Sequence, residues 1–416
     1  QISPKFTEET LLTILKRATG SDSIKLIKYE VSGDTTRGGD SYLSTLVRMK
    51  IEGLIDNKSY PVSIVIKTLP KNIGRRKTFR SCDFFKNEVS FYNEVLQKFM
   101  VFQNEKKPKN PFYEIPRCLY ALADGENDFI ALEDVSIHGF ESGDRMEGVN
   151  FDHCAAVLKT LGRFHALSLA VKDQDPEGFK IISSKVKETY WHEDFKSWYY
   201  GQFEKFKKIC LEAVSKEYPN SVYEEKFKHF ADDTLYDQLS ELAKAKTPYA
   251  VIGHGDTWAP NFMFTYTDEQ KKCIKDIRMI DFQLARYGSP INDLSFYIFS
   301  CTTQEFRCSH FKELMKVYYS SVSEFLQDLG SSPDDVFSHE AFEKEMLTYM
   351  KFGLGFSLES VPFSLMDESE ASNLDLIEGN EAVPIEKVWN VAPLKTKEAR
   401  LRIADNFKFA VDNGYL

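Results

Sequence analysis

Alternation of apolar and polar residues marks three strands in the first 70 residues of the chain. They span residues 23–31, 41–51 and 60–69. The loop at residues 32–40 contains glycine and joins the first two strands, and the polar segment 52–59 joins the second to the third. Short connections between alternating segments are typical of antiparallel hairpins. The pattern therefore predicts an antiparallel meander, and residues 112–122 and 128–135 add two further strands.

A helical period follows the strands. Residues 79–100 carry an apolar stripe, and Glu88 falls on that stripe together with Phe84 and Tyr92. From about residue 150 helical segments dominate, at 152–171, 191–214, 224–245, 310–329 and 343–358. The N-terminal residues 1–20 also read as a capped amphipathic helix.

These elements predict an α+β fold with two lobes. Residues 1–135 would form an N-lobe that has an antiparallel sheet and one main helix. Residues 136–416 would form a larger, mostly helical C-lobe. The short segment Glu133 to Val135 would be the hinge, with the cleft beside it.

Composition narrows the class of partner. A net charge of -10 gives no electrostatic support for binding nucleic acid or an anionic membrane. No apolar run is long enough to span a bilayer, and none resembles a signal peptide. The seven cysteines contain no C-x-x-C pair, which favours reduced thiols and a cytoplasmic protein. We therefore expect no nucleic acid, no membrane and no obligate protein partner.

Lys67 and Glu88 form the first candidate pair. Lys67 ends an apolar strand, and Glu88 lies on the buried face of the following helix. An ionised carboxylate in apolar surroundings costs several kcal/mol unless it is paired, so Lys67 is its natural partner. The alternative is an exposed lysine and a solvated glutamate.

The glycine-bearing loop before the second strand is a candidate phosphate site. Gly38 and Gly39 would let the backbone approach phosphate groups, and Ser41 or Ser44 could donate a hydroxyl. Strand, glycine loop, strand, lysine and helical glutamate follow one another as in kinase N-lobes. By itself the loop also fits an ordinary hairpin connection.

Two carboxylates and a carboxamide stand farther along the chain, in "HGDTWAPN" and "MIDFQLA". Asp256 and Asn261 are five residues apart, as are the catalytic aspartate and metal-binding asparagine of protein kinases. Asp281 follows a strand and would be the second Mg²⁺ ligand beside Asn261. A lone pair of this kind is more often a loop cap, but the whole set in this order predicts phosphoryl transfer from ATP on a bilobal, protein-kinase-like fold. The N-lobe, residues 1–135, would then bind the nucleotide, and the C-lobe, residues 136–416, would carry catalysis and the acceptor site.

The residues around these three positions predict supporting roles and a small acceptor. His254 would order the loop, Asp293 would bind its backbone N–H groups, and His165 would be a hydrogen-bonded core residue. Only a dozen residues separate Asp281 from Asp293, which leaves no room for the segment that binds peptides in protein kinases. Gln283 stands where those enzymes have the glycine of D-F-G, which argues against a flipping switch.

The motifs together resemble the insect ecdysteroid kinase-like family, a relative of choline kinases and aminoglycoside phosphotransferases. The matching stretches are "RGGDSYLS", "IVIK", "KNEVSFYNEVL", "ALEDV", "LGRFHALS", "HGDTWAPNFMF" and "MIDFQLARYGSPINDLSFYI". The resemblance implies ATP-dependent phosphorylation of a small-molecule hydroxyl. The activity that gives the family its name is phosphorylation of an ecdysteroid hydroxyl, typically at C22.

Carried over by position, the resemblance implies that Asp256 is catalytic, that Asn261 and Asp281 bind Mg²⁺, and that Lys67, paired with Glu88, contacts phosphate. The resemblance also implies that backbone groups of the hinge, at Glu133 and Val135, contact adenine. Ser41 stands where we expect asparagine in this family.

Two other interpretations stay open. The acceptor could be a dietary toxin, or a cation such as choline or an aminoglycoside, which an acidic or aromatic pocket would bind. The chain could also be an inactive hormone-binding protein, although such a protein has no need of five charged or polar groups in a cleft.

Overall fold

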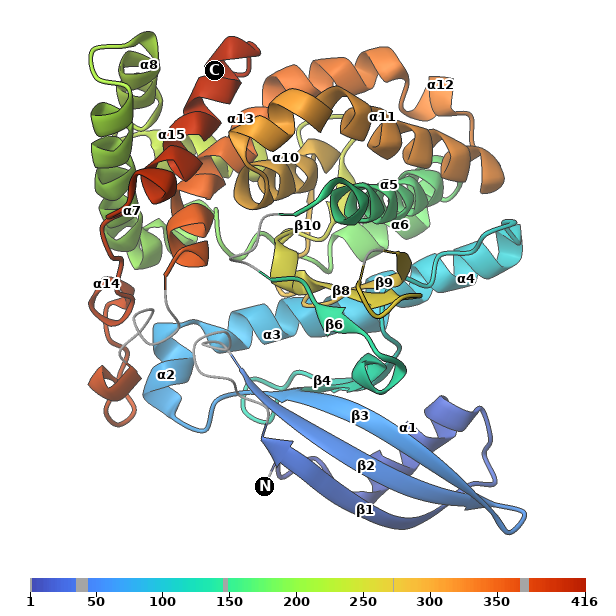
Figure 1. Ribbon diagram of the computed structural model, residues 1–416. Coiled ribbons are helices and arrows are strands. Elements are labelled where there is room, and N and C mark those ends of the chain that lie inside the picture. Colours follow the sequence, from blue (N-terminus) through green and yellow to red (C-terminus); the bar gives the residue numbers. More distant parts are fainter. Residues whose placement is uncertain (1, 35–43, 145–148, 272, 367–373) are drawn as a thin grey trace.

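The computed structural model describes residues 2–34, 44–144, 149–271, 273–366 and 374–416. The N-terminal part is built on a five-stranded antiparallel sheet with the order β1-β2-β3-β5-β4 (Figure 1). Its strands are β1 (Lys25–Asp34), β2 (Thr45–Ile55), β3 (Lys58–Thr68), β4 (Cys118–Leu122) and β5 (Phe129–Glu133). Helix α1 (Glu8–Thr19) begins at a capping box formed by Thr7 and Thr10, and it packs on this sheet. The predicted antiparallel sheet is confirmed.

The connection between β2 and β3 is tighter than predicted. Both strands continue through the segment 52–59, and only Asp56 and Asn57 form the turn, with φ values of 48° and 64°. Asp and Asn tolerate this left-handed conformation, and two-residue turns of this hand match the twist of paired strands. The predicted longer turn is therefore wrong.

The helix that carries Glu88 is interrupted. It comprises α3 (Ser81–Ser90), a π-helical turn η1 (Phe91–Val95) and α4 (Leu96–Lys106), and the short α2 (Ile73–Thr78) precedes it. The predicted helix at residues 79–100 is thus present, with one wider turn in its middle.

The C-terminal part is mostly helical, as predicted. Its helices are α5 (Phe151–Gln174), α6 (Pro176–Ser183), α7 (Lys196–Glu217), α8 (Val222–Phe230), α9 (Leu235–Ala243), α10 (Pro290–Cys301), α11 (Gln304–Asp328), α12 (Pro333–Val336), α13 (His339–Ser364), α14 (Ile385–Val388) and α15 (Lys397–Asp412). Short strands accompany them: β6 (Glu141–Ser142), β7 (Val251–Gly253), β8 (Phe262–Tyr266), β9 (Ile274–Met279) and β10 (Arg286–Gly288). The expectation that no apolar run is long enough to span a bilayer is wrong for α5, which could do so by length and composition, but 78% of its apolar window is buried inside the protein.

One predicted helix is in fact two. The segment 224–245 divides into α8 and α9, because the Asp232 side chain accepts hydrogen bonds from the N–H and hydroxyl of Thr234 at 2.8 and 2.7 Å. A side chain that binds the backbone two residues ahead favours a turn over a continuous helix.

Two hydrophobic clusters lie in the described chain. The smaller one is under the N-terminal sheet and includes Leu15, Ile64 and Phe129. The larger one fills the C-terminal part and also takes in α3 and α4. The helix of Glu88 is therefore anchored in the larger core, whereas Lys67 comes from the sheet. A lobe boundary at residues 135 and 136 stays a prediction.

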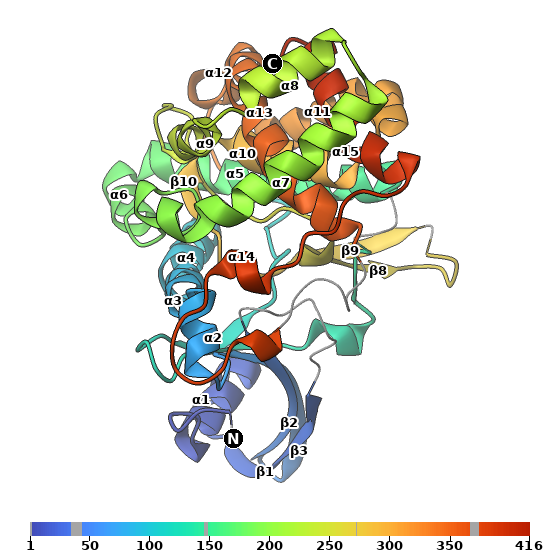
Figure 2. The same ribbon diagram turned by 90° about the vertical axis from the view of Figure 1, so that its left-hand side faces the viewer.

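A C-terminal segment, residues 374–389, returns to the N-terminal part and lies along α2 (Figure 2). The N–H of Gly74 donates to the carbonyl of Gly379 at 3.2 Å, and the N–H of Val383 donates to the Thr78 hydroxyl at 2.9 Å. A Cβ at Gly74 would lie 2.7 Å from the Glu381 carbonyl oxygen, so glycine permits this close approach. We call residues 374–389 the strap.

Candidate active site

Lys67 lies between two carboxylates. Its Nζ is 2.7 Å from Oε2 of Glu88 and 2.8 Å from Oδ1 of Asp281, and Oε1 of Gln283 lies 3.5 Å away. The predicted pairing of Lys67 with Glu88 is therefore present, and Asp281, which lies 214 residues from Lys67 in sequence, joins it.

Electrostatics explain why this lysine stays charged. Burial alone would lower the pKa of Lys67, but the charges of Asp281 and Glu88 outweigh burial and raise it above its ordinary value. Burial raises the pKa of Glu88, and the ammonium of Lys67 opposes that rise. We infer an ammonium shared between two carboxylates, which is poised to meet a further anion such as a phosphate group.

Asp256 and Asn261 are brought together by the loop between β7 and β8. The Nδ2 of Asn261 donates to the Asp256 carbonyl at 2.9 Å and to its Oδ2 at 3.1 Å. Burial and the charge of Asp281 raise the pKa of Asp256 to about 7, and the bond from Asn261 opposes that rise. A carboxylate with this pKa can take a proton near neutral pH.

Asp293 holds the backbone of this loop, as predicted. Its carboxylate accepts the N–H of His254 at 2.6 Å and that of Gly255 at 2.9 Å, and His165 Nε2 lies 3.0 Å from it. His254 in turn contacts the Ile280 carbonyl through Nε2 at 2.9 Å. Burial lowers the pKa of His254, which favours a neutral ring that orders the loop.

Gly255 and Phe282 fix the loop against the segment after Asp281. Gly255 has a φ of 84°, and a Cβ there would lie 1.8 Å from the Leu284 carbonyl oxygen. The ring of Phe282 is fully buried and stacks on Phe91 at 3.9 Å. This packing agrees with the expectation that the Asp281 segment does not flip.

The predicted phosphate loop precedes β2, and the predicted hinge follows β5. Gly38, Gly39 and Ser41 lie outside the described residues, and Ser44 is buried just before β2. At the hinge, the N–H of Glu133 donates to the Arg117 carbonyl at 3.0 Å, and the contact of hinge backbone groups with adenine stays a prediction. Val135 N–H begins the short helix η2 (Val135–His138) and has no partner within that helix.

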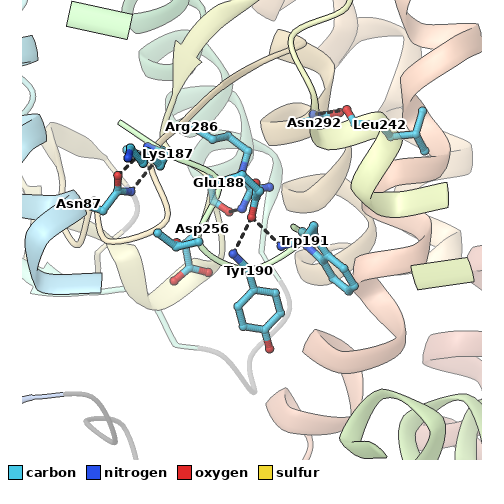
Figure 3. A network of polar contacts seen from close by, with 12 residues as sticks. Asn87, Lys187, Glu188, Tyr190, Trp191, Leu242, Asp256, Arg286 and Asn292 are labelled. Carbon is cyan, nitrogen blue, oxygen red and sulfur yellow. Dashed lines mark hydrogen bonds and ion pairs between the residues drawn. The ribbon is translucent and has the colours of Figure 1, made fainter. Parts of the chain in front are cut away.

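Sequence reasoning missed Asn87, the neighbour of Glu88. Its Nδ2 donates to the carbonyls of Gln283 and Ala285 at 3.0 and 2.8 Å, and its Oδ1 accepts the N–H of Lys187 at 2.8 Å (Figure 3). The only signal of this role is the burial of Asn87. The sequence does not show that burial, because a polar residue beside an apolar helical stripe is usually exposed.

Glu188 extends this network to the loop that carries Asp256 and Asn261. One of its oxygens accepts the N–H groups of Tyr190 and Trp191, each at 2.7 Å, and its other oxygen lies 2.7 Å from Nε of Arg286 (Figure 3). Arg286 also donates to the Gly255 carbonyl at 3.3 Å. The segment 187–191 is thus tied both to α3 and to the loop that carries Asp256.

The donor set fits Mg²⁺ bound together with phosphates. Within the described ranges, no group of three His, Cys, Asp or Glu side chains forms a metal cage. Asp281 Oδ2 takes part in no hydrogen bond or ion pair with the described residues, and Asn261 donates through Nδ2, which leaves its amide oxygen for a cation. Mg²⁺ usually takes one or two protein oxygens plus phosphates and waters, so Asp281 and Asn261 suffice.

Comparisons with known proteins agree with the sequence motifs. The model of the ecdysteroid kinase-like family matches residues 38–331. This range includes the five predicted site residues Lys67, Glu88, Asp256, Asn261 and Asp281. A comparison with curated proteins finds no match. Among solved structures, the Plasmodium vivax ethanolamine kinase Pv091845 is similar at 12% identity and a TM-score of 0.39, over 100% of this chain and 94% of that chain. A likeness this distant says nothing of the acceptor.

Proposed function

The chain belongs to the ecdysteroid kinase-like family, and from this premise we propose that it transfers the γ-phosphoryl group of ATP to a hydroxyl of a small organic acceptor. We take an ecdysteroid hydroxyl, such as that at C22, as the first acceptor, because of the family to which the chain belongs. The observation that supports transfer most directly is the convergence of Lys67, Asp281 and Asp256 from three distant segments.

In the proposed reaction Asp256 accepts the proton of the acceptor hydroxyl. The hydroxyl oxygen forms a bond to the γ-phosphorus, the bond from that phosphorus to the bridging oxygen breaks, and ADP leaves with the electron pair. Asn261 holds the Asp256 carboxylate in place through Nδ2 at 3.1 Å. Lys67, kept in position by Glu88 at 2.7 Å, would contact phosphate oxygens.

Mg²⁺, when bound, would neutralise charge on the phosphates, and Asp281 with the amide oxygen of Asn261 would hold it. We propose the cytoplasm as the compartment, which the seven free cysteines support.

The experiment is phosphate transfer from Mg-ATP to 20-hydroxyecdysone, ecdysone, choline and kanamycin. Mass spectrometry and NMR would identify the product and the phosphorylated hydroxyl, and Asp256→Asn protein is the blank. We expect transfer to an ecdysteroid. Transfer to choline or kanamycin alone would mean that the acceptor is a cation and not an ecdysteroid. Folded protein that phosphorylates none of the four compounds would count against the proposal.

A further inference from the structure

Glu359 on α13 is a buried carboxylate with no cationic partner. It is 8% exposed, and no Lys, Arg or His nitrogen of the described chain lies within 4.0 Å of it. The Tyr190 hydroxyl donates to its Oε1 at 2.8 Å and contacts Oε2 at 2.9 Å, and the Tyr199 hydroxyl donates to Oε2. A carboxylate offers about four acceptor positions, so these bonds leave room for one more donor.

The two tyrosines that bind this carboxylate belong to a cluster of aromatic rings, which we call the aromatic enclosure. The Tyr190 ring centroid lies 4.7 Å from that of Tyr199, and 5.7 Å from those of Trp198 and Phe356. The hydroxyl groups that bind Glu359 are therefore carried by rings packed among other aromatic side chains. Ligand sites commonly combine such apolar surroundings with few polar groups that fix orientation.

The enclosure adjoins the catalytic aspartate. The segment that carries Tyr190 is bound to the loop of Asp256 through Glu188 and Arg286. Trp258 of that loop and Ser360, the neighbour of Glu359 on α13, line the same small cavity, so the loop and this part of α13 lie next to each other.

Glu345, on the same helix, shows what a structural carboxylate looks like here. It is also buried, and it accepts the hydroxyls of Thr247 at 2.8 Å and Ser289 at 2.7 Å. It lies fourteen residues before Glu359, about 21 Å along a helix, and the positive charge of Lys172 acts on it. Glu359 differs by its aromatic enclosure and its lack of a cation.

We propose that Glu359 selects the acceptor. Its carboxylate would accept a hydrogen bond from a second polar group of the acceptor, a hydroxyl or an ammonium, while a different hydroxyl faces Asp256. The inference rests on the proposed function, because it places the acceptor beside Asp256. An acceptor with one hydroxyl and no other donor would then bind poorly.

Binding is measured by calorimetry with the full chain and ADP present, for wild type, Glu359→Gln, Glu359→Leu and the control Glu345→Gln. The probes are 20-hydroxyecdysone for hydroxyl donors, dimethylaminoethanol for an ammonium, and 3-methyl-1-butanol as its uncharged analogue. Circular dichroism checks folding, and Tyr199→Phe gives a milder variant should the leucine variant not fold.

The two donor types give different results. If a hydroxyl binds Glu359, affinity for 20-hydroxyecdysone falls about tenfold in Glu359→Leu and much less in Glu359→Gln, whose amide oxygen still accepts a hydrogen bond. If an ammonium binds, affinity for the amine falls about tenfold or more in both variants, because both lack the charge.

Two outcomes would overturn the proposal. One is affinities within about twofold of wild type in both Glu359 variants for every probe, and the other is no binding of either donor-bearing probe to wild type. Phosphate transfer is assayed in parallel. Binding that depends on Glu359 without any transfer would count against the kinase function alone.

Discussion

Asn87 on α3 accepts the backbone N–H of Lys187 at 2.8 Å, across 100 residues of sequence. The same side chain donates to the carbonyls of Gln283 and Ala285. One buried amide thus joins the helix of Glu88, the segment after Asp281 and the segment that leads to Tyr190. The helix that positions Lys67 and the segment that carries Tyr190 are therefore held in a fixed position relative to each other.

Replacing Asn87 by alanine should uncouple these segments. Three backbone groups would lose their partner, so we expect a loss of about 1–3 kcal/mol in the free energy of unfolding and a lower kcat. Urea unfolding and the kinase assay measure the two effects. Asn93→Ala is the control, because Asn93 lies on the adjoining π-helical turn but is exposed. Equal effects in both variants would mean that Asn87 has no special role.

Replacing Asp256 by asparagine should remove the proton acceptor and keep the shape of the loop. We expect kcat to fall about a hundredfold or more, with little change in the KM for ATP. Steady-state kinetics with the acceptor found in the panel measure both constants. Near-normal turnover would refute the role of Asp256 as base.

Replacing Gly255 by alanine should distort the catalytic loop. Alanine would adopt a φ of 84° and meet the Leu284 carbonyl oxygen at 1.8 Å. Gly125→Ala is the matched control, since its φ is 89° but no atom lies within 4 Å of the added Cβ. We expect the control to lose about 1–2 kcal/mol of stability, and Gly255→Ala to lose clearly more. Thermal unfolding of both proteins makes the comparison, and equal losses would contradict the steric argument.

Stability should fall as pH rises toward neutrality because of Glu359. Burial raises its pKa to about 7, although the bonds from Tyr199 and Tyr190 oppose this. Between about pH 4.5 and 7 the folded state then holds a proton that the unfolded state has lost. The free energy of unfolding falls across this range, by about 3 kcal/mol in total. Glu359→Gln should therefore gain stability relative to wild type between pH 5 and pH 8.

Urea unfolding at the two pH values tests this expectation. Glu340→Gln on the same helix is the control. Glu340 is exposed, and the hydrogen bond from Lys344 lowers its pKa, so the variant should run parallel to wild type between pH 5 and pH 8. A difference between Glu359→Gln and wild type that does not change with pH would exclude the carboxylate as the source of the pH dependence.

Local patterns in the sequence predicted the core of the site. Lys67 ends an alternating strand, Glu88 lies on a helical stripe, and Asp256 and Asn261 are five residues apart, so each carries a short-range signal. Their meeting with Asp281 followed from the order of these motifs along the chain.

Contacts between distant segments carried no such signal. Glu359 lies within an apolar helix and meets Tyr190 from 169 residues away, so only the folded chain brings them together. The tight turn at Asp56 and Asn57 was missed for another reason. Both residues favour left-handed turns, but the polar residues on either side of them, such as Glu52 and Ser59, suggested that the whole segment 52–59 was a loop.

The strap gives the protein a second crossing between its two parts. One crossing is the hinge near Glu133, and the other is formed by residues 374–389, which are bonded to α2 through Gly74 and Thr78. Strap residues, among them Ile377 and Val388, also belong to the larger hydrophobic cluster. The strap therefore fastens α2 to the C-terminal core. Any movement that separates α2 from that core has to break these hydrogen bonds and expose the apolar surface beneath them.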